Sequence, residues 1–132
     1  MTVLTLPDVA SQTARSPAAL TWVGMEGIAL PIRLGSRSVT AKLSAGVSLD
    51  DADARGIHMS RLYLALAPLE EAPLTLPAVK DILNAFLTSQ EGLSQNAYLS
   101  IEGELALKRQ ALISPLAGWK SYPFTLRCQL TP

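Results

Sequence analysis

The stretch TLPAVKDILNAFLTSQEG, residues 75–92, decides the fold class because it is the clearest helix in the chain. Thr75 is a favoured N-cap residue, Pro77 suits a first helical turn, and Gly92 is a typical stop after the last turn. Apolar residues recur between these signals at the spacing of one helix face. We predict a helix over residues 76–90 whose apolar face packs on the core (Leu76, Val79, Ile82, Leu83, Phe86, Leu87) and whose polar face meets solvent (Lys80, Asp81, Asn84, Thr88).

Strands are predicted on both sides of this helix. Apolar and polar residues alternate in them, which is typical of a strand with one buried face. Pro31 cannot donate a ladder hydrogen bond, so its strand belongs at a sheet margin. A helix set against one face of an antiparallel sheet gives an α+β fold. The expected strands are residues 27–34, 39–49 and 59–66 before the helix, the third antiparallel to the second, and residues 98–107 and 122–130 after it.

The composition indicates one globular domain with no electrostatic footprint for nucleic acid or an anionic membrane. The chain has 132 residues, 48% of them hydrophobic, and a net charge of zero. Its N-terminus lacks the segments of a signal peptide, and the longest apolar run, residues 62–69, is too short to span a bilayer. We expect a cytoplasmic protein in which residues 1–19 form an extended or poorly ordered arm and residues 20–132 form a single unit.

The single cysteine excludes an internal disulfide. In the alternating segment around it, Cys128 shares a face with Phe124, Leu126 and Leu130. We therefore interpret Cys128 as a small core hydrophobe rather than a nucleophile or metal ligand. One cysteine and one histidine without spaced partners do not make a metal site.

A polar cluster follows the second predicted strand in VSLDDADARGIHMSRLYLAL, residues 47–66. It holds the only histidine, His58, with Ser60 and Arg61 beside it at the start of an apolar run. The residues alone leave two interpretations open, because short motifs are weak signals. One is a solvated strand end in which His58 and Arg61 brace the preceding acidic loop. The other is a binding site at one end of the sheet. The loop carboxylates are Asp50, Asp51 and Asp53.

This cluster resembles the N-terminal signature of type IB GTP cyclohydrolases, which usually read G-[TI]-H-M-S-R at this point. The similarity extends to LPDVA near the start, to LTWVGM at residues 20–25, and to Tyr122-Pro123. It implies a tunnelling-fold (T-fold) unit, an antiparallel sheet backed by helices that joins others edge to edge into barrels. Members of the family carry two such units and form tetramers. The resemblance covers almost the whole chain and implies that residues 20–132 form the first unit, with the second unit absent.

The resemblance also implies a reaction. GTP and water give 7,8-dihydroneopterin triphosphate and formate, the first step of tetrahydrofolate biosynthesis. Full-length members use a divalent metal (zinc, manganese or iron) to activate water. Their metal ligands, in a Cys-Pro-Cys segment with later His and Glu residues, and their guanine-anchoring glutamate lie in the second unit. None has a counterpart here, so we assign no metal ligand and no catalytic residue, and expect the isolated chain to be inactive.

Four residues are candidate substrate contacts, and the resemblance supplies three of them. Arg61 would pair with phosphate oxygens, Ser60 would donate a hydroxyl hydrogen bond, and His58 would donate or shuttle a proton. Lys108, beside Arg109, is a second basic candidate, for which a solvated strand end is the alternative.

GTP is the expected substrate, and the expected partners are further copies of the chain or the missing C-terminal half. The alternative function is a non-catalytic tunnelling-fold module for binding or assembly. Glu102 and Glu104 are read as a solvated face.

Overall fold

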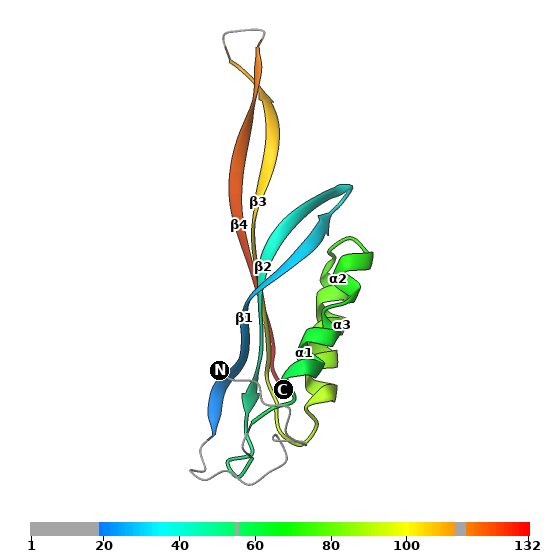
Figure 1. The fold of residues 1–132 in the computed structure, drawn as a ribbon, viewed down its shortest axis with the longest axis vertical. Coiled ribbons are helices and arrows are strands. Elements are labelled where there is room, and N and C mark those ends of the chain that lie inside the picture. The colour runs from blue at the N-terminus through cyan, green and yellow to red at the C-terminus, as the bar shows by residue number, and fades with distance from the viewer. Residues whose placement is uncertain (1–18, 55, 113–115) are drawn as a thin grey trace.

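The structure is a computed structural model that describes residues 19–54, 56–112 and 116–132, so the expected N-terminal arm lies almost wholly outside the described residues. The described part contains four strands and three helices (Figure 1). None of these helices has both the length and the apolar content needed to cross a membrane. The elements are β1 (Leu20–Leu34), β2 (Arg37–Leu49), α1 (Met59–Ala65), α2 (Pro68–Glu71), α3 (Leu76–Ser89), β3 (Ala97–Gln110) and β4 (Ala117–Leu130).

The four strands form one antiparallel sheet in the order β1-β2-β3-β4. All three helices connect β2 to β3 and cover one face of the sheet (Figure 1). This arrangement confirms the predicted α+β class. Pro31 lies in β1, an edge strand of the described sheet, as its missing N–H predicts.

The core lies between the helices and the covered face of the sheet. Alternate residues of each strand point to this face, which is why the apolar positions recur at every second residue. The largest fully buried apolar side chains come from both layers: Ile32, Leu43, Val47, Leu99 and Ile101 from the sheet, and Leu62, Leu66, Leu69, Ile82 and Phe86 from the helical layer.

Helix α3 matches the predicted helix closely. The Thr75 hydroxyl accepts a hydrogen bond from Ala78 N at 3.2 Å, and so caps the first turn. The face made by Val79, Ile82, Leu83 and Phe86 is buried, and the predicted polar face is exposed. Leu76 is the exception: it is 80% exposed, because the buried face begins one turn later.

The predicted strand over residues 59–66 is wrong, because this segment forms α1. Its buried leucines, Leu62 and Leu66, are four residues apart and so lie on one helix face. Tyr63 and Leu64 between them are 49% and 69% exposed. The segment has no β-branched residue and contains three leucines, one alanine, a methionine and an arginine, all of which favour helix. The residues after the acidic loop therefore open a short helix, and they add no strand to the sheet.

The two hairpins of the sheet separate at one end (Figure 1). Strands β2 and β3 pair only from Lys42↔Glu102 to Val47↔Ala97. Strands β3 and β4 continue together as far as Gln110↔Ala117. The distal part of the β3–β4 hairpin, residues 103–110 and 117–124, therefore projects as an arm away from the helical layer. The opposite end of the sheet lies beside the acidic loop and the start of α1.

Candidate functional site

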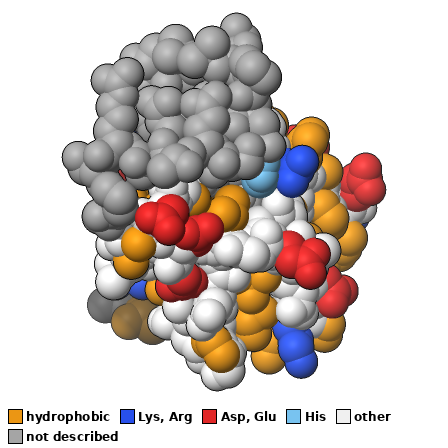
Figure 2. All heavy atoms as spheres, turned by 90° about the horizontal axis from the view of Figure 1, so that it is seen from below, with side chains coloured by type: hydrophobic (Ala, Val, Ile, Leu, Met, Phe, Trp, Pro, Cys, Tyr) orange, Lys and Arg blue, Asp and Glu red, His pale blue; other side chains and the backbone are white. Residues whose placement is uncertain are grey.

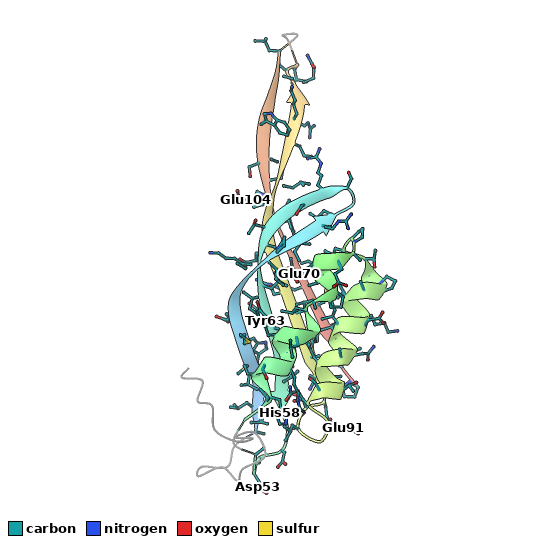
Figure 3. The ribbon with its side chains drawn as sticks, turned by 45° about the vertical axis from the view of Figure 1, so that its right-hand side comes forward. Asp53, His58, Tyr63, Glu70, Glu91 and Glu104 are labelled. Carbon is teal, nitrogen blue, oxygen red and sulfur yellow. The ribbon has the colours of Figure 1, made fainter. Side chains whose placement is uncertain are left out.

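The residues of the His-Met-Ser-Arg block gather at the end of the molecule where β2 finishes. His58 is half-buried and precedes α1, and Ser60 and Arg61 are exposed in its first turn. Figure 2 shows the histidine side chain at the surface of this end, with a basic side chain beside it. Figure 3 places Asp53 and Glu91 at the same end as His58. The structure therefore brings three of the four predicted substrate contacts together.

A polar network fastens the end of β2 to the start of β3. The Ser48 side chain is 2% exposed, and its hydroxyl accepts a hydrogen bond from Asn96 N at 3.0 Å. The same hydroxyl donates to Asp50 Oδ2 at 2.6 Å, and this oxygen also accepts from Gln95 N at 2.7 Å. Because buried polar groups are costly unless they are paired, this network fixes where the acidic loop leaves the sheet.

The peptide backbone of His58 is held by a side chain from the end of α3. Gln90 is fully buried, and its Oε1 accepts a hydrogen bond from His58 N at 2.7 Å. Its Nε2 donates to His58 O at 2.8 Å. Both backbone groups of His58 are thereby satisfied at the point where the chain enters α1.

Arg61 bonds to the end of the same helix. Its Nη1 donates to Ser89 O at 3.2 Å, which places a cation at the negative C-terminal end of α3. One interpretation of the sequence predicts that Arg61 contacts the carboxylates of the acidic loop, but its hydrogen bond goes to α3 instead. The carboxylate of Asp50 accepts from Ser48 and Gln95, and Asp51 Oδ1 accepts from Asp53 N at 3.0 Å.

Lys108, the fourth predicted substrate contact, lies far from the other three within one chain. It is exposed on the arm, opposite Trp119 in the β3–β4 register. Figure 3 shows Glu104, four residues before Lys108, well separated from His58 along the length of the sheet. Glu102 and Glu104 are both exposed, and Glu104 Oε2 accepts from Ser121 Oγ at 3.1 Å.

The side chains present do not fit the metal that the family resemblance implies. Within residues 19–54, 56–112 and 116–132, no three His, Cys, Asp or Glu side chains lie together as a metal site requires. Cys128 is half-buried against the core, as its alternating pattern predicts. Burial raises the pKa of the Cys128 thiol, so the thiolate that a metal or an electrophile needs is disfavoured.

The uncovered face of the sheet carries a shallow pocket of about 270 Å³, which the sequence did not predict. Trp22 lies across Gly46, where an added Cβ would meet the indole ring at 2.3 Å. A glycine is therefore required at this position for the ring to lie flat on β2. The pocket is lined by Trp22, Ser44, Tyr98, Leu99, Ser100, Arg127, Cys128 and Gln129, and it contains none of the predicted site residues.

Two site residues, Gln90 and Ser48, were also not predicted. The sequence does carry a signal for Gln90: it follows Phe86 by four residues and Leu83 by seven, so it continues the buried face of α3. A polar residue at such a position needs internal partners. Ser48 carries no comparable signal, because it falls at a polar position of an alternating strand and its burial depends on the loop that covers it.

Comparison with known proteins finds a matching family and similar relatives. The family described as "Type I GTP cyclohydrolase folE2" matches residues 6–132. A "GTP cyclohydrolase FolE2" from Chromohalobacter salexigens is 54% identical over 125 residues, which are 95% of this chain and 41% of that protein. A protein of the same name from Pseudomonas putida is 56% identical over 126 residues, 96% of this chain and 42% of its own length. The chain thus spans about two fifths of the length of these curated relatives.

Proposed function

The chain belongs to the type I GTP cyclohydrolase folE2 family, and we propose that it supplies part of the substrate-binding wall of an enzyme that converts GTP and water to 7,8-dihydroneopterin triphosphate and formate. The observation that carries this proposal is the family match over residues 6–132, which includes the whole His-Met-Ser-Arg block. The names of the two relatives support the reaction.

In this proposal the first turn of α1 contacts GTP. Arg61 uses Nη1 on the carbonyl of Ser89, and its exposed guanidinium has further N–H groups for phosphate oxygens. Ser60 presents an exposed hydroxyl beside it. His58 sits one turn earlier with its backbone fixed, so its imidazole can donate a hydrogen bond or pass a proton at the substrate edge.

We further propose that the chain is a tunnelling-fold unit corresponding to the N-terminal half of a type IB enzyme. The metal ligands and guanine anchor would then belong to the remaining three fifths of the protein, and the chain alone would not turn over GTP. Lys108 would reach substrate only from another copy or another unit, because it lies on the arm.

A non-catalytic assembly module is the second candidate. The observation that favours it is the set of open edges: β1 and β4 each have a neighbour on one side only in the described sheet. Unpaired edges promote pairing with another chain. The two candidates differ in whether α1 binds GTP, so they are separated by a ligand-binding measurement.

The test compares Arg61→Ala with Arg33→Ala in the full-length enzyme. Arg33 is a matched control, because its Nη1 also donates to the last carbonyl of a helix, Glu71 O at 3.4 Å. Losing a charge-assisted phosphate contact of about 1.5–3 kcal/mol should weaken GTP binding by about 10- to 100-fold. Guanosine, which lacks the triphosphate, should bind nearly as before. Titration calorimetry with both ligands measures the difference.

Arg33→Ala should leave both affinities unchanged. If Arg61→Ala weakens GTP and guanosine binding equally, Arg61 only secures the end of α3. If neither ligand is affected, the substrate role of this turn is wrong and the assembly module is favoured.

A further inference from the structure

Gln90 is an unusual buried residue. In the described part of the chain only Ser48 and Gln90 are polar side chains in the buried class, and Gln90 is 0% exposed. An amide is costly to bury unless its donors and acceptor are paired. Gln90 lies at the C-cap of α3, where an apolar side chain would extend the packed face without that cost. The presence of Gln90 at a core position therefore points to a role beyond packing.

The bonds of Gln90 converge on one residue. Oε1 accepts from His58 N at 2.7 Å and Nε2 donates to His58 O at 2.8 Å, so the amide pairs with both backbone groups of a single residue. A neighbouring β-strand makes the same exchange. The pair fixes His58 at φ −82° and ψ 85°, outside helical geometry, so α1 begins immediately after it. The second hydrogen of Nε2 points to Ser89 Oγ at 3.2 Å.

The next residue toward the N-terminus of α3 holds the other end of the same turn. Ser89 O accepts from Arg61 Nη1 at 3.2 Å. Two consecutive residues, Ser89 and Gln90, thus bond to the entrance of α1 at His58 and to its first turn at Arg61. The Arg61–Ser89 contact joins residues 28 apart in sequence, and the His58–Gln90 contact joins residues 32 apart. The direction of the first turn of α1 therefore depends on the C-terminal end of α3.

We propose that Gln90 is a positioning residue: it fixes the backbone of His58, and so the direction in which the imidazole leaves the chain, and it sets the first turn of α1. The substrate that His58 would face is GTP, so this inference rests on the proposed function for the identity of the substrate. A glutamine is suited to the task because one planar amide supplies the acceptor and the donor at the spacing of a peptide group.

The experiment uses the chain itself, in which His58 is the only histidine, so its ring C–H signals are identified directly in an NMR spectrum. Gln90→Leu removes both bonds at similar volume. It should shift and broaden the His58 ring signals and increase the exchange rate of the His58 amide at least tenfold. Val79→Ala is the control: Val79 is buried near the other end of α3, so its loss destabilises the chain without touching His58.

Gln90→Glu separates the contribution of the Oε1 acceptor from that of the Nε2 donor, and it replaces the leucine variant if that variant does not fold. It keeps the acceptor for His58 N and, once ionised, loses the donor to His58 O. The amide should stay protected while the ring signals move. Lowering the pH protonates the carboxyl, restores the donor and should return the ring signals toward those of the parent, measured against the parent's own pH titration.

The proposal is overturned if Gln90→Leu leaves the His58 ring signals in place, or if Val79→Ala moves them as much at equal stability. GTP binding by the full-length enzyme is a separate readout. Displaced His58 signals with weaker GTP binding support both the positioning role and the proposed function. Displaced signals with unchanged GTP binding uphold the positioning role and overturn the substrate role of His58.

Discussion

Three side chains at the site end of the molecule bond to backbone groups. Ser48 bonds to the start of β3, Gln90 to the peptide of His58, and Arg61 to the last turn of α3. The Ser48 and Gln90 contacts join the segment before α1 to the segment after α3, and the Arg61 contact joins the first turn of α1 to the last residue of α3. Since backbone groups are fixed by the fold, these bonds hold the block of His58, Ser60 and Arg61 in one place, whereas mobile charged partners would not.

The burial of neighbouring leucines gives a prediction at this scale. Leu62 is 0% exposed and Leu64 is 69% exposed, as α1 requires. Leu62→Ala should lower the free energy of unfolding by about 2–5 kcal/mol, because it opens a cavity in the core. Leu64→Ala should cost less than about 0.5 kcal/mol, as for other surface changes.

Denaturant titration of the two leucine variants provides the measurement. A strand would place both leucines on the same face, since its side chains alternate with period two. Equal destabilisation by the two changes would therefore contradict the helix and support the strand that the sequence first indicated.

Helix α3 contributes both to the stability of the core and to the position of the site residues. Its buried face packs on the sheet, and its C-terminal end holds His58 and Arg61. A change on the buried face should therefore act on the whole fold, and a change on the exposed face should not.

Phe86→Ala and Asp81→Ala test this division. Phe86 is fully buried, so its loss should cost about 3–5 kcal/mol. Asp81 is exposed on the opposite face, and its replacement should be nearly neutral. The midpoints of chemical unfolding compare the two variants. Similar midpoints for both would show that the assigned faces of α3 are wrong.

The sequence predicts elements well where a local pattern determines them. The Thr75 cap, the spacing of Val79 and Phe86, and the alternation of β2 each act within a few residues, so α3 and most of the four strands follow. Strands β1 and β4 nevertheless begin at Leu20 and Ala117, before the predicted starts at residues 27 and 122. The prediction for segment 59–66 is wrong because its three leucines fit the spacing of a strand or of a helix over so short a length. Only the burial of Leu62 and Leu66 against α3 and the sheet selects the helix.

The site is predictable only in part for a related physical reason. His58, Ser60 and Arg61 are adjacent in sequence, so any fold keeps them together. The partners that hold them come from residues 89–96, and no local pattern links these two segments. Lys108 was grouped with the site by its charge, yet β3 carries it to the other end of the sheet.

At the scale of the whole molecule, the helical layer and the site block lie toward one end and the arm projects from the other (Figure 1). Two sheet edges and one sheet face remain uncovered in the described part. The two relatives are 54% and 56% identical to this chain, and the match covers about two fifths of their own length. We propose that this unit contributes to GTP binding and that the rest of a longer enzyme supplies the metal chemistry.

Formate release from GTP is the measurement that tests this division of roles. The purified chain, with zinc, manganese or iron added in turn, should release no formate, because its described residues provide no metal site. The same chain extended to the full length of its relatives should release formate, and Arg61→Ala should reduce this activity at low GTP concentration. Metal-dependent formate release by the isolated chain, abolished by His58→Ala, would contradict the account and would mean that a complete active site lies within these 132 residues.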